Sequence, residues 1–486
     1  MRYLFFVLLF SVALCANNLQ REDATKQAIV KIYNVAKVPN YLSPWSSSMQ
    51  STTGSGAIIE GGYILTNAHV VANQAFLEVQ RYGERKRYIA KVYAVSHQAD
   101  LALLKVEEKA FFRGVTPLKL GSLPQVEQQI VVYGYPMGGS TLSATIGVVS
   151  RIEHHTYAHS GESFLAIQVD AAVNPGNSGG PALSDGKIVG VVMQVISRSQ
   201  NIGYLVPTSM VRHFIEDMKD GHYDGFADLG IETRSLENPA LRRYYGLDEN
   251  VTGKVIYHIA YGSSAKRVLQ KDDIITAIDG HNIENDGTVE FRRHEYTNYY
   301  YYVDRHQMGD EVVFDIIRNH TPMKVAVVLR KRSDDMFLVE TTRYDEMPRY
   351  VIYGGYLFAP LTRNLIRSTN RNRLELSYLS TQWKEKDRDE VVVLLKVLAS
   401  EISRGDNTLG MWPVTRINGT PFKNFRQFVT MMDGLKEPYY RLEDKDGMEV
   451  IIDRQEAMQK QRAILKKYNI EYDRSQDLRE ANTTQP

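Results

Sequence analysis

Cysteine is almost absent from this sequence. The single one among 486 residues, Cys15, lies in an apolar N-terminal segment. Disulfide bonds, cysteine metal ligands and cysteine nucleophiles are therefore excluded for the rest of the chain. A protein without disulfide bonds depends on its hydrophobic core, and 43% hydrophobic residues over this length are enough for a large one.

The sequence also lacks an excess of charge of either sign. Its 58 basic and 57 acidic residues give a formal net charge of +1, so there is no electrostatic basis for nucleic-acid binding. Beyond residue 16, no apolar run reaches the roughly 18 residues that a membrane-spanning helix needs. His154 and His155 have no companion ligands at a metal-binding spacing, and we expect neither a metal nor another cofactor.

Residues 1–16 have the three parts of a secretory signal peptide. Arg2 is the positive start, an apolar stretch runs from Leu4 to Leu14, and small residues up to Ala16 mark a cleavage zone. The alternative, an uncleaved membrane anchor, is disfavoured because the apolar stretch is too short to cross a bilayer. We expect an exported protein, periplasmic if the source is a Gram-negative bacterium.

Residues 54–207 alternate short β-prone runs with glycine, asparagine and aspartate. This pattern is typical of antiparallel β barrels or sandwiches. A proline- and serine-rich loop is predicted at 39–53, and a helix at 208–219 with Thr208 or Ser209 as its N-cap. The predicted strands are 28–33, 56–59, 63–65, 90–95, 101–106, 130–133, 147–152, 164–169, 188–193 and 203–206.

A change of composition at 220–225 marks a boundary, and the length of the chain allows about three domains. The unit that follows, 226–333, combines predicted strands with a short helix at 262–269. Within it, 288–305 contains a run of tyrosines and is predicted as a helix, although a strand is also possible. A weaker copy of the unit recurs at 349–455, which indicates an internal repeat. The last residues have a charged helical pattern, which predicts a solvated or docking helix followed by disorder.

A glycine-rich turn at 170–181 contains the best candidate for a nucleophile, Ser178. Three glycines beside it, Gly176, Gly179 and Gly180, permit positive φ angles and close backbone approach. Exposed backbone N–H groups in such a turn can bind a developing oxyanion. The segment also fits the G-x-S-x-G pattern of the α/β-hydrolases, so the order of the partner residues has to decide between the two chemistries.

A serine nucleophile needs a base and a group that orients the base. His69 and Asp100, each at the end of a predicted strand, precede Ser178 in the chain. The order histidine, aspartate, serine is that of the chymotrypsin arrangement, whereas an α/β-hydrolase has the serine first. Each residue alone would have an ordinary structural role, but the three in this order predict a catalytic triad. Competing candidates are His97, Asp170 and the pair His154 and His155.

Five short segments of the sequence carry a family resemblance: 53–57, 65–71, 99–104, 170–181 and 201–207. In these segments the sequence resembles the HtrA/Deg family of trypsin-like serine proteases with PDZ domains, especially the Deg proteases of plants and their bacterial relatives. The resemblance implies a mainly β protein, in which a chymotrypsin-like double β-barrel protease domain precedes two PDZ-like α+β domains. The implied boundaries are 1–16 for the signal peptide, 17–220 for the protease domain, 225–335 and 346–455 for the PDZ-like domains, and 456–486 for a charged tail.

The same resemblance assigns roles to residues of the site. His69 becomes the general base, Asp100 its orienting carboxylate and Ser178 the nucleophile, and the backbone N–H groups of Gly176 and Ser178 form the oxyanion hole. Ala172 lies at the base of the first specificity pocket. It carries no charge. The pocket is therefore expected to disfavour a lysine or arginine of the substrate and to favour substrate residues with small or medium apolar side chains. The wall of that pocket consists of Ile202, Gly203, Tyr204 and Leu205.

The PDZ-like units imply peptide binding by β-augmentation, in which backbone N–H groups hold the carboxylate of a chain end. In the first unit Leu229, Gly230 and Ile231 form the carboxylate loop. In the second unit the corresponding loop is 354–358, for which peptide binding and subunit contact are both open.

These features together predict an exported, ATP-independent serine endopeptidase. Its expected partners are unfolded or damaged polypeptides and peptide C-termini, and it is expected to form a homo-oligomer. A chaperone or assembly scaffold is the alternative, because the chain beyond residue 225 lies outside the protease domain. A non-proteolytic esterase is disfavoured by the order of the three residues.

Overall fold

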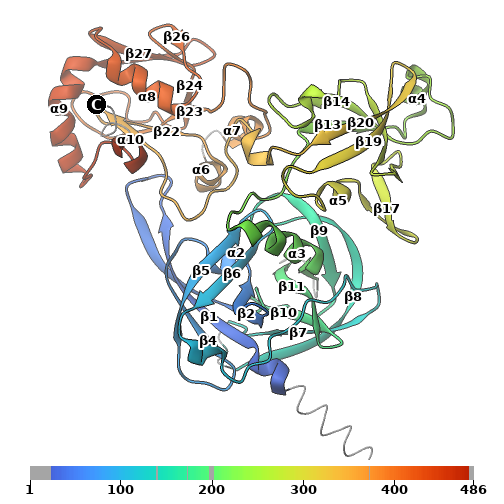
Figure 1. Ribbon diagram of the computed structural model, residues 1–486. Coiled ribbons are helices and arrows are strands. Elements are labelled where there is room, and N and C mark those ends of the chain that lie inside the picture. The colour runs from blue at the N-terminus through green and yellow to red at the C-terminus, as the bar shows by residue number, and fades with distance from the viewer. Residues whose placement is uncertain are drawn as a thin grey trace, which may run out of the picture.

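The structure is a computed structural model of the chain. It describes residues 23–480 except Gly138, Ser140, Ala172, 196–201 and 371–372. The predicted signal peptide at 1–16, with Cys15, lies outside the described residues. The protein is mainly β: two barrels lie side by side at the bottom of Figure 1, and two smaller units of strands and helices lie above them. Among the described helices, none is long and apolar enough to cross a membrane.

The first barrel closes in the strand order β1–β2–β3–β6–β5–β4. Its strands alternate between the core and the surface, as in β5, where Tyr88, Ala90 and Ala94 are buried. Each large apolar side chain buried in such a core contributes about 1.5–3 kcal/mol. The elements are β1 (Ile29–Pro39), β2 (Ser47–Ile59), β3 (Tyr63–Thr66), α2 (Ala68–Val71), β4 (Gln74–Arg81), β5 (Tyr88–Ser96), β6 (Leu101–Val106) and the 3-10 helix η1 (Lys109–Phe112).

The second barrel closes in the order β10–β11–β12–β9–β8–β7. Ile130, Ile167 and Leu205 are fully buried in its core. The strands predicted between residues 28 and 207 are all present, and β4 and β10 are additional to the prediction. The elements are β7 (Gln129–Gly134), β8 (Ser143–Thr156), β9 (Ser163–Val169), β10 (Pro181–Ser184), β11 (Lys187–Val195) and β12 (Gly203–Pro207).

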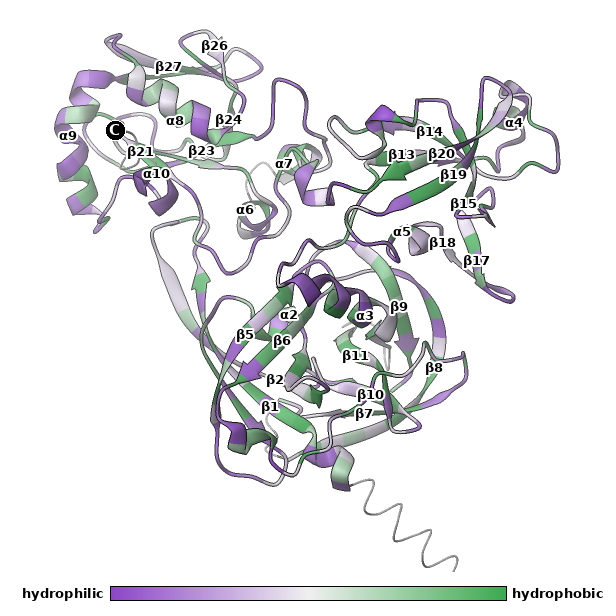
Figure 2. Ribbon diagram, viewed as in Figure 1, coloured by the Kyte–Doolittle hydropathy of each residue, from purple (hydrophilic) through white to green (hydrophobic). Residues whose placement is uncertain are grey.

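Helix α3 (Thr208–Asp217) follows β12 and confirms the helix predicted from residue 208. Its Met210, Val211 and Phe214 are buried, while its polar face is purple in Figure 2. The predicted N-cap is wrong, because Pro207 takes that position and no side chain caps the helix. Pro207 already has the extended backbone that precedes a helix, with φ −72° and ψ 156°.

Strands β1 and β2 continue beyond the first barrel as a two-stranded arm, blue in Figure 1. The pairing runs without interruption from Ile29 opposite Ala57 to Pro39 opposite Ser47. The loop predicted at 39–53 is confirmed at 40–46 but is wrong at 47–53, which belong to β2. Its outer serine, glutamine and threonine side chains are exposed, so the segment lacks the apolar alternation by which a strand is recognised.

The second unit contains a sheet in the order β13–β14–β15–β19–β20, with β16 paired to β15. The helix predicted at 288–305 is mostly wrong, since β17 and β18 form a hairpin and only α5 is helical. Val289 and Thr297 are buried opposite each other in this hairpin, so its alternation is that of strands. The helix predicted at 262–269 is reduced to the 3-10 helix η3.

The elements of this part are η2 (Met218–Asp220), β13 (Ile231–Ser235), α4 (Pro239–Tyr244), β14 (Lys254–Ile259), η3 (Ala265–Arg267), β15 (Ile274–Ile278), β16 (His281–Asn282), β17 (Thr288–Arg292), β18 (Glu295–Asn298), α5 (Tyr300–Val303), β19 (Glu311–Arg318), β20 (Thr321–Val328) and η4 (Ser333–Asp335).

The third unit contains two sheets, ordered β21–β22–β23–β24 and β26–β25–β27–β28. Helices α6 and α7 lie between the second and third units in Figure 1. The elements are β21 (Val351–Tyr353), β22 (Tyr356–Pro360), α6 (Arg363–Ser368), α7 (Arg373–Leu379), β23 (Val392–Val397), β24 (Trp412–Val414), β25 (Arg416–Ile417), β26 (Thr420–Pro421), α8 (Phe425–Gly434), β27 (Tyr439–Glu443), β28 (Glu449–Asp453), α9 (Arg454–Lys467) and α10 (Gln476–Glu480).

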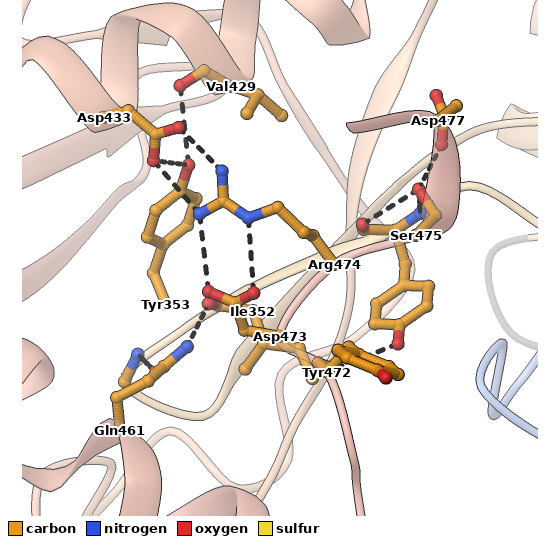
Figure 3. A network of polar contacts seen from close by, with 12 residues as sticks. Ile352, Tyr353, Val429, Asp433, Gln461, Tyr472, Asp473, Arg474, Ser475 and Asp477 are labelled. Atoms are coloured by element: carbon orange, nitrogen blue, oxygen red, sulfur yellow. Dashed lines mark hydrogen bonds and ion pairs between the residues drawn. The ribbon is translucent and has the colours of Figure 1, made fainter. Parts of the chain in front are cut away.

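The C-terminal segment contains a docking helix, α9, as predicted, but the residues after it up to 480 belong to the third unit, which differs from the predicted disorder. Helix α9 docks through the buried Ala457 and Ile464. Beyond it, Arg474 pairs antiparallel with Val351 of β21. Figure 3 shows the Arg474 guanidinium bonded to Asp433 of α8, at 2.8 Å, and to the neighbouring Asp473. The sheet edge at β21 is thus covered by the chain itself.

Candidate active site

His69 and Asp100 lie on adjacent loops at one end of the first barrel. His69 is in the short helix α2, directly after β3, and Asp100 directly precedes β6. Because β3 and β6 pair antiparallel, the end of one strand lies beside the start of the other. The two side chains meet there, with 2.7 Å between His69 Nδ1 and Asp100 Oδ2. The other carboxylate oxygen accepts the backbone N–H of His69 at 2.9 Å.

The backbone of Asp100 is held in an unusual conformation. Its φ is +53°, a left-handed value that aspartate tolerates better than most residues. The buried Asn67 donates its side-chain N–H to the carbonyl of Asp100 at 2.8 Å. The loop therefore fixes the direction of the carboxylate.

Burial and charge act against each other in this pair. The side chain of Asp100 is 1% exposed and that of His69 32%. Burial alone would raise the pKa of Asp100, but the charge and hydrogen bond of His69 lower it below its ordinary value. Burial also opposes the charged form of His69, yet Asp100 raises the pKa of His69 above its ordinary value. The pair is arranged to hold a proton on the imidazole.

Ser178 lies in the turn between β9 and β10 of the second barrel, and this turn contacts the loop that carries His69. A Cβ atom at Gly179, where φ is +81°, would lie 2.1 Å from Thr66 Oγ1 and 3.1 Å from the backbone N of Asn67. The residue after Ser178 is therefore pressed against the chain that enters α2. Only glycine can occupy this position.

Two further glycines hold the turn against the second barrel. A Cβ atom at Gly176 would lie 2.5 Å from the carbonyl oxygen of Tyr135, and one at Gly180 would lie 2.1 Å from that of Tyr133. Ser55 of β2 donates its hydroxyl to the carbonyl of Gly176 at 2.7 Å and accepts the N–H of Tyr135 at 2.8 Å. Both barrels thus shape the turn.

Among the contacts of the described residues, no hydrogen bond joins Ser178 to His69. The backbone N–H groups of Gly176 and Ser178 also donate to no acceptor among the residues that the structure describes. The turn therefore leaves a hydroxyl, partly exposed on Ser178, and two N–H donors available beside α2.

Of the residues predicted for the specificity pocket, Ala172 lies outside the described residues. Ile202 is partly buried, and a Cβ atom at Gly203 would lie 2.7 Å from Val173. Tyr204 is buried and stacks on His155, with 4.0 Å between the ring centroids. Leu205 belongs to the core of the second barrel.

The competing candidates have other partners. Asp170 accepts the N–H of Val148 at 2.6 Å. His154 lies 3.1 Å from Asp304 of the second unit and 3.0 Å from the hydroxyl of Thr297. Within the described part of the chain, no group of three or more histidine, cysteine, aspartate or glutamate side chains could hold a metal ion.

Three residues beside the pair are absent from the sequence prediction. His159, in the turn between β8 and β9, lies with its ring centroid 6.1 Å from that of His69. Tyr344 and Asp345, which follow the second unit, contact His159 and His97. No local motif marks them, since 248 residues separate His97 from Asp345.

The carboxylate loop predicted in the second unit holds a carboxylate of its own. Leu229 and Ile231 are buried, and Gly230, with φ +68°, turns the chain between them. The N–H of Gly230 donates to the side chain of Asp228 at 2.6 Å. Burial raises the pKa of Asp228 to about 6.

The loop predicted in the third unit, 354–358, is closed by α9. The N–H of Gly354 donates to the side chain of Gln461 at 2.7 Å, and Gln461 in turn donates to the carbonyl of Ile352 at 2.6 Å. The edge of β21 beside it is also taken, because Ile352 donates its N–H to the carbonyl of Asp473 at 2.7 Å (Figure 3). The hydrogen-bonding groups of the loop and of the strand edge are therefore both occupied by other parts of the same chain.

Two family models match the chain. A trypsin-like peptidase domain matches residues 54–191, which include His69, Asp100 and Ser178. A PDZ domain matches residues 339–477, which cover the third unit and the segment that pairs with β21.

Several curated proteins are similar over most of the chain. Protease Do-like 2, chloroplastic, of Arabidopsis thaliana is 38% identical over 461 residues, which cover 93% of this chain and 75% of that protein. Protease Do-like 4, mitochondrial, of the same plant is 35% identical over 457 residues, 93% of this chain and 86% of that protein. A serine protease DegP homolog of Plasmodium falciparum is 30% identical over 514 residues, 84% of this chain and 59% of that protein.

Among solved structures, a variant of the HtrA-type protease AlgW with a decapeptide has a TM-score of 0.52 and 24% sequence identity, covering 64% of this chain and 98% of that one. This likeness shows a shared fold.

Proposed function

The chain belongs to the Do-like family of serine endopeptidases, and we propose that His69, Asp100 and Ser178 are its catalytic triad. One observation carries the proposal: the turn of Ser178 is pressed against the loop on which His69 binds the buried Asp100 at 2.7 Å. These are the nucleophile, base and orienting group that acyl transfer from a peptide bond requires.

The geometry supports the following sequence of steps. Ser178 Oγ attacks the scissile carbonyl carbon while its proton passes to Nε2 of His69, whose Nδ1–H remains bonded to Asp100. The backbone N–H groups of Gly176 and Ser178 stabilise the oxyanion. His69 then gives the proton to the leaving amine, and the carbon–nitrogen bond breaks. A water molecule activated by His69 hydrolyses the acyl-enzyme and restores Ser178.

Unfolded or damaged polypeptides are the proposed substrates, cleaved without ATP. An uncharged Ala172 supports small or medium apolar side chains at the first pocket, whose proposed wall is Ile202, Gly203, Tyr204 and Leu205. The units at 225–335 and 346–455 are proposed to bind peptide segments or to govern assembly into a homo-oligomer. The decapeptide in the AlgW structure supports peptide binding in this architecture.

We also propose that the protein works beyond a membrane. The signal-like residues 1–16 support export, to the periplasm if the source is a Gram-negative bacterium. Two of the plant relatives are named chloroplastic and mitochondrial, and their names support delivery to an organelle as the counterpart in a eukaryote.

Substitution of the proposed nucleophile tests the proposal. Purified wild-type protein should cleave unfolded casein and react with a fluorophosphonate probe at Ser178. The Ser178→Ala variant should lose both, with a fall in cleavage rate of at least about 10³-fold, while its thermal unfolding stays unchanged. Cleavage by Ser178→Ala at the wild-type rate would show that the serine is not the nucleophile.

The same variant separates the protease from a chaperone or scaffold. If binding of unfolded protein were the main activity, Ser178→Ala would suppress aggregation as well as the wild type does, and the wild type would react poorly with the probe. If proteolysis is the main activity, the wild type should instead react rapidly with the probe at Ser178.

A further inference from the structure

The linker between the second and third units contacts the protease domain beside His69 and Asp100. Asp345, at its centre, lies 2.8 Å from His97 through its Oδ2 and the imidazole Nε2. Its backbone N–H donates to the side chain of Asn73 at 2.8 Å, and its carboxylate accepts the backbone N–H of Asn73. Asn73 follows helix α2, which carries His69.

Tyr344 of the same linker packs on two imidazole rings. Its ring centroid lies 3.9 Å from that of His159 and 4.7 Å from that of His97, nearly parallel to both. Its hydroxyl donates to the carbonyl of His159 at 2.8 Å. The tyrosine therefore fixes both the backbone and the ring of His159.

A chain of hydrogen bonds leads from Asp345 to His159. The carboxylate only accepts, so His97 Nε2 carries the hydrogen. His97 Nδ1 in turn lies 2.8 Å from His159 Nε2. Burial lowers the pKa of His159 to about 3, which keeps this ring neutral. One carboxylate from the linker thus orients both rings.

The three contacts of the linker surround the His69–Asp100 pair. His97 is on the loop that leads into Asp100, Asn73 is on the turn after His69, and His159 lies 6.1 Å from the His69 ring between centroids. Each is on a separate loop of the protease domain. A displaced linker would release all three loops together.

We propose that Tyr344 and Asp345 are positioning residues for catalysis, which hold His69 and Asp100 in their working orientation while the linker is docked. This inference rests on the proposed role of the triad.

The test uses the full-length chain and a short fluorogenic peptide. Asp345→Ala should lower kcat by about 10- to 100-fold, because small displacements of a catalytic group have effects of this size, while KM changes less than about twofold. The rate of fluorophosphonate labelling at Ser178 should fall by the same factor. Asp345→Ala combined with His97→Ala should cost little more than either substitution alone, since both act through one chain of contacts.

Glu346→Ala is the matched control. It removes the neighbouring linker carboxylate, whose partner is Arg343 at 3.8 Å, and should leave kcat unchanged. Circular dichroism confirms that each variant is folded, and the low-field proton resonance of the His69–Asp100 hydrogen bond should shift in Asp345→Ala only. A wild-type kcat in Asp345→Ala, or an equal fall in Glu346→Ala, overturns the inference and leaves the triad standing. A wild-type protein that does not label at Ser178 overturns the proposed function and the inference with it.

Discussion

At the scale of single residues, Gly179 decides whether Ser178 can face His69. A Cβ atom there would meet the backbone oxygen of Ser55 at 2.3 Å as well as Thr66. We expect Gly179→Ala to push the turn away from α2 and to lower kcat/KM by about 100-fold or more. Peptide cleavage and probe labelling of the folded fraction measure the loss.

Gly434→Ala is a suitable control for this substitution. Gly434 ends helix α8, its φ is not positive, and no atom lies within 4 Å of the position of a Cβ. Its kcat/KM should equal that of the wild type. If Gly179→Ala also cleaved and labelled at the wild-type rate, the turn would not need the close contact with the His69 loop.

Asp228 offers a pH-dependent prediction in the second unit. Its pKa is raised to about 6, so the carboxylate at Gly230 is charged at pH 7.5 and mostly protonated at pH 5.5. The C-terminal carboxylate of a peptide stays charged over this range. We expect a free C-terminal peptide to bind about fivefold more tightly at pH 5.5, because one repulsion between like charges is removed.

The Asp228→Asn variant should bind that peptide tightly at both pH values in fluorescence anisotropy. Asp248→Asn is the control, since Asp248 makes a similar turn contact with Asn250 away from this loop, and it should keep the wild-type pH dependence. An affinity that rises with pH in the wild type would contradict the assignment of this loop.

The candidate site could be predicted from the sequence only where local motifs carry it. His69, Asp100 and Ser178 each occur in a short recognisable segment, and their order distinguishes two chemistries. Asp345 and Tyr344 could not be found, because 248 and 185 residues separate them from their partners His97 and His159. Contacts over such separations leave no periodic pattern in the sequence.

At the scale of elements, burial explains which predictions succeed. Strands with a buried face, such as β5, are recognised by their runs of β-branched and aromatic residues. The hairpin β17–β18 is not recognised as two strands, because the aromatic residues in 288–305 fit a helical period as well as a strand period. The outer part of β2 is not recognised either, since its exposed polar side chains resemble those of a loop.

The segment that pairs with the edge of β21 gives a prediction on stability. Arg474, 14% exposed, bonds Asp433 of α8 at 2.8 and 3.3 Å and so ties this segment to the third unit. Arg474→Ala should lower the free energy of unfolding of this unit by about 1–3 kcal/mol, as for other hydrogen bonds to charged groups. Amide exchange at Ile352, which pairs with Asp473, and urea unfolding measure the change.

Lys460→Ala serves as the comparison for this prediction. Lys460 forms an exposed ion pair with Glu401 at 3.2 Å, and its removal should cost less than about 1 kcal/mol. Equal losses in the two variants would mean that Arg474 contributes no more than a surface ion pair.

At the scale of the whole molecule, polar contacts between residues far apart in the sequence help to join the units. The His154 side chain of the second barrel, 7% exposed, lies 3.1 Å from Asp304 of the second unit. Trp383 donates its indole N–H to Glu232 at 2.8 Å and so links the second and third units. The sequence predicts the separate units but not this docking, because each contact is one pair among many polar residues that could have formed another.

The two-stranded arm of β1 and β2 imposes an order on folding during synthesis. Its Trp45 packs on Tyr350 with 5.9 Å between ring centroids, and Lys396 donates to Ser43 at 3.0 Å, a contact that spans 353 residues. The arm leaves the ribosome well before its supporting surface has been made. A lone two-stranded ribbon is at best marginally stable. The arm therefore stays exposed to proteolysis and chaperones until the third unit folds and captures it.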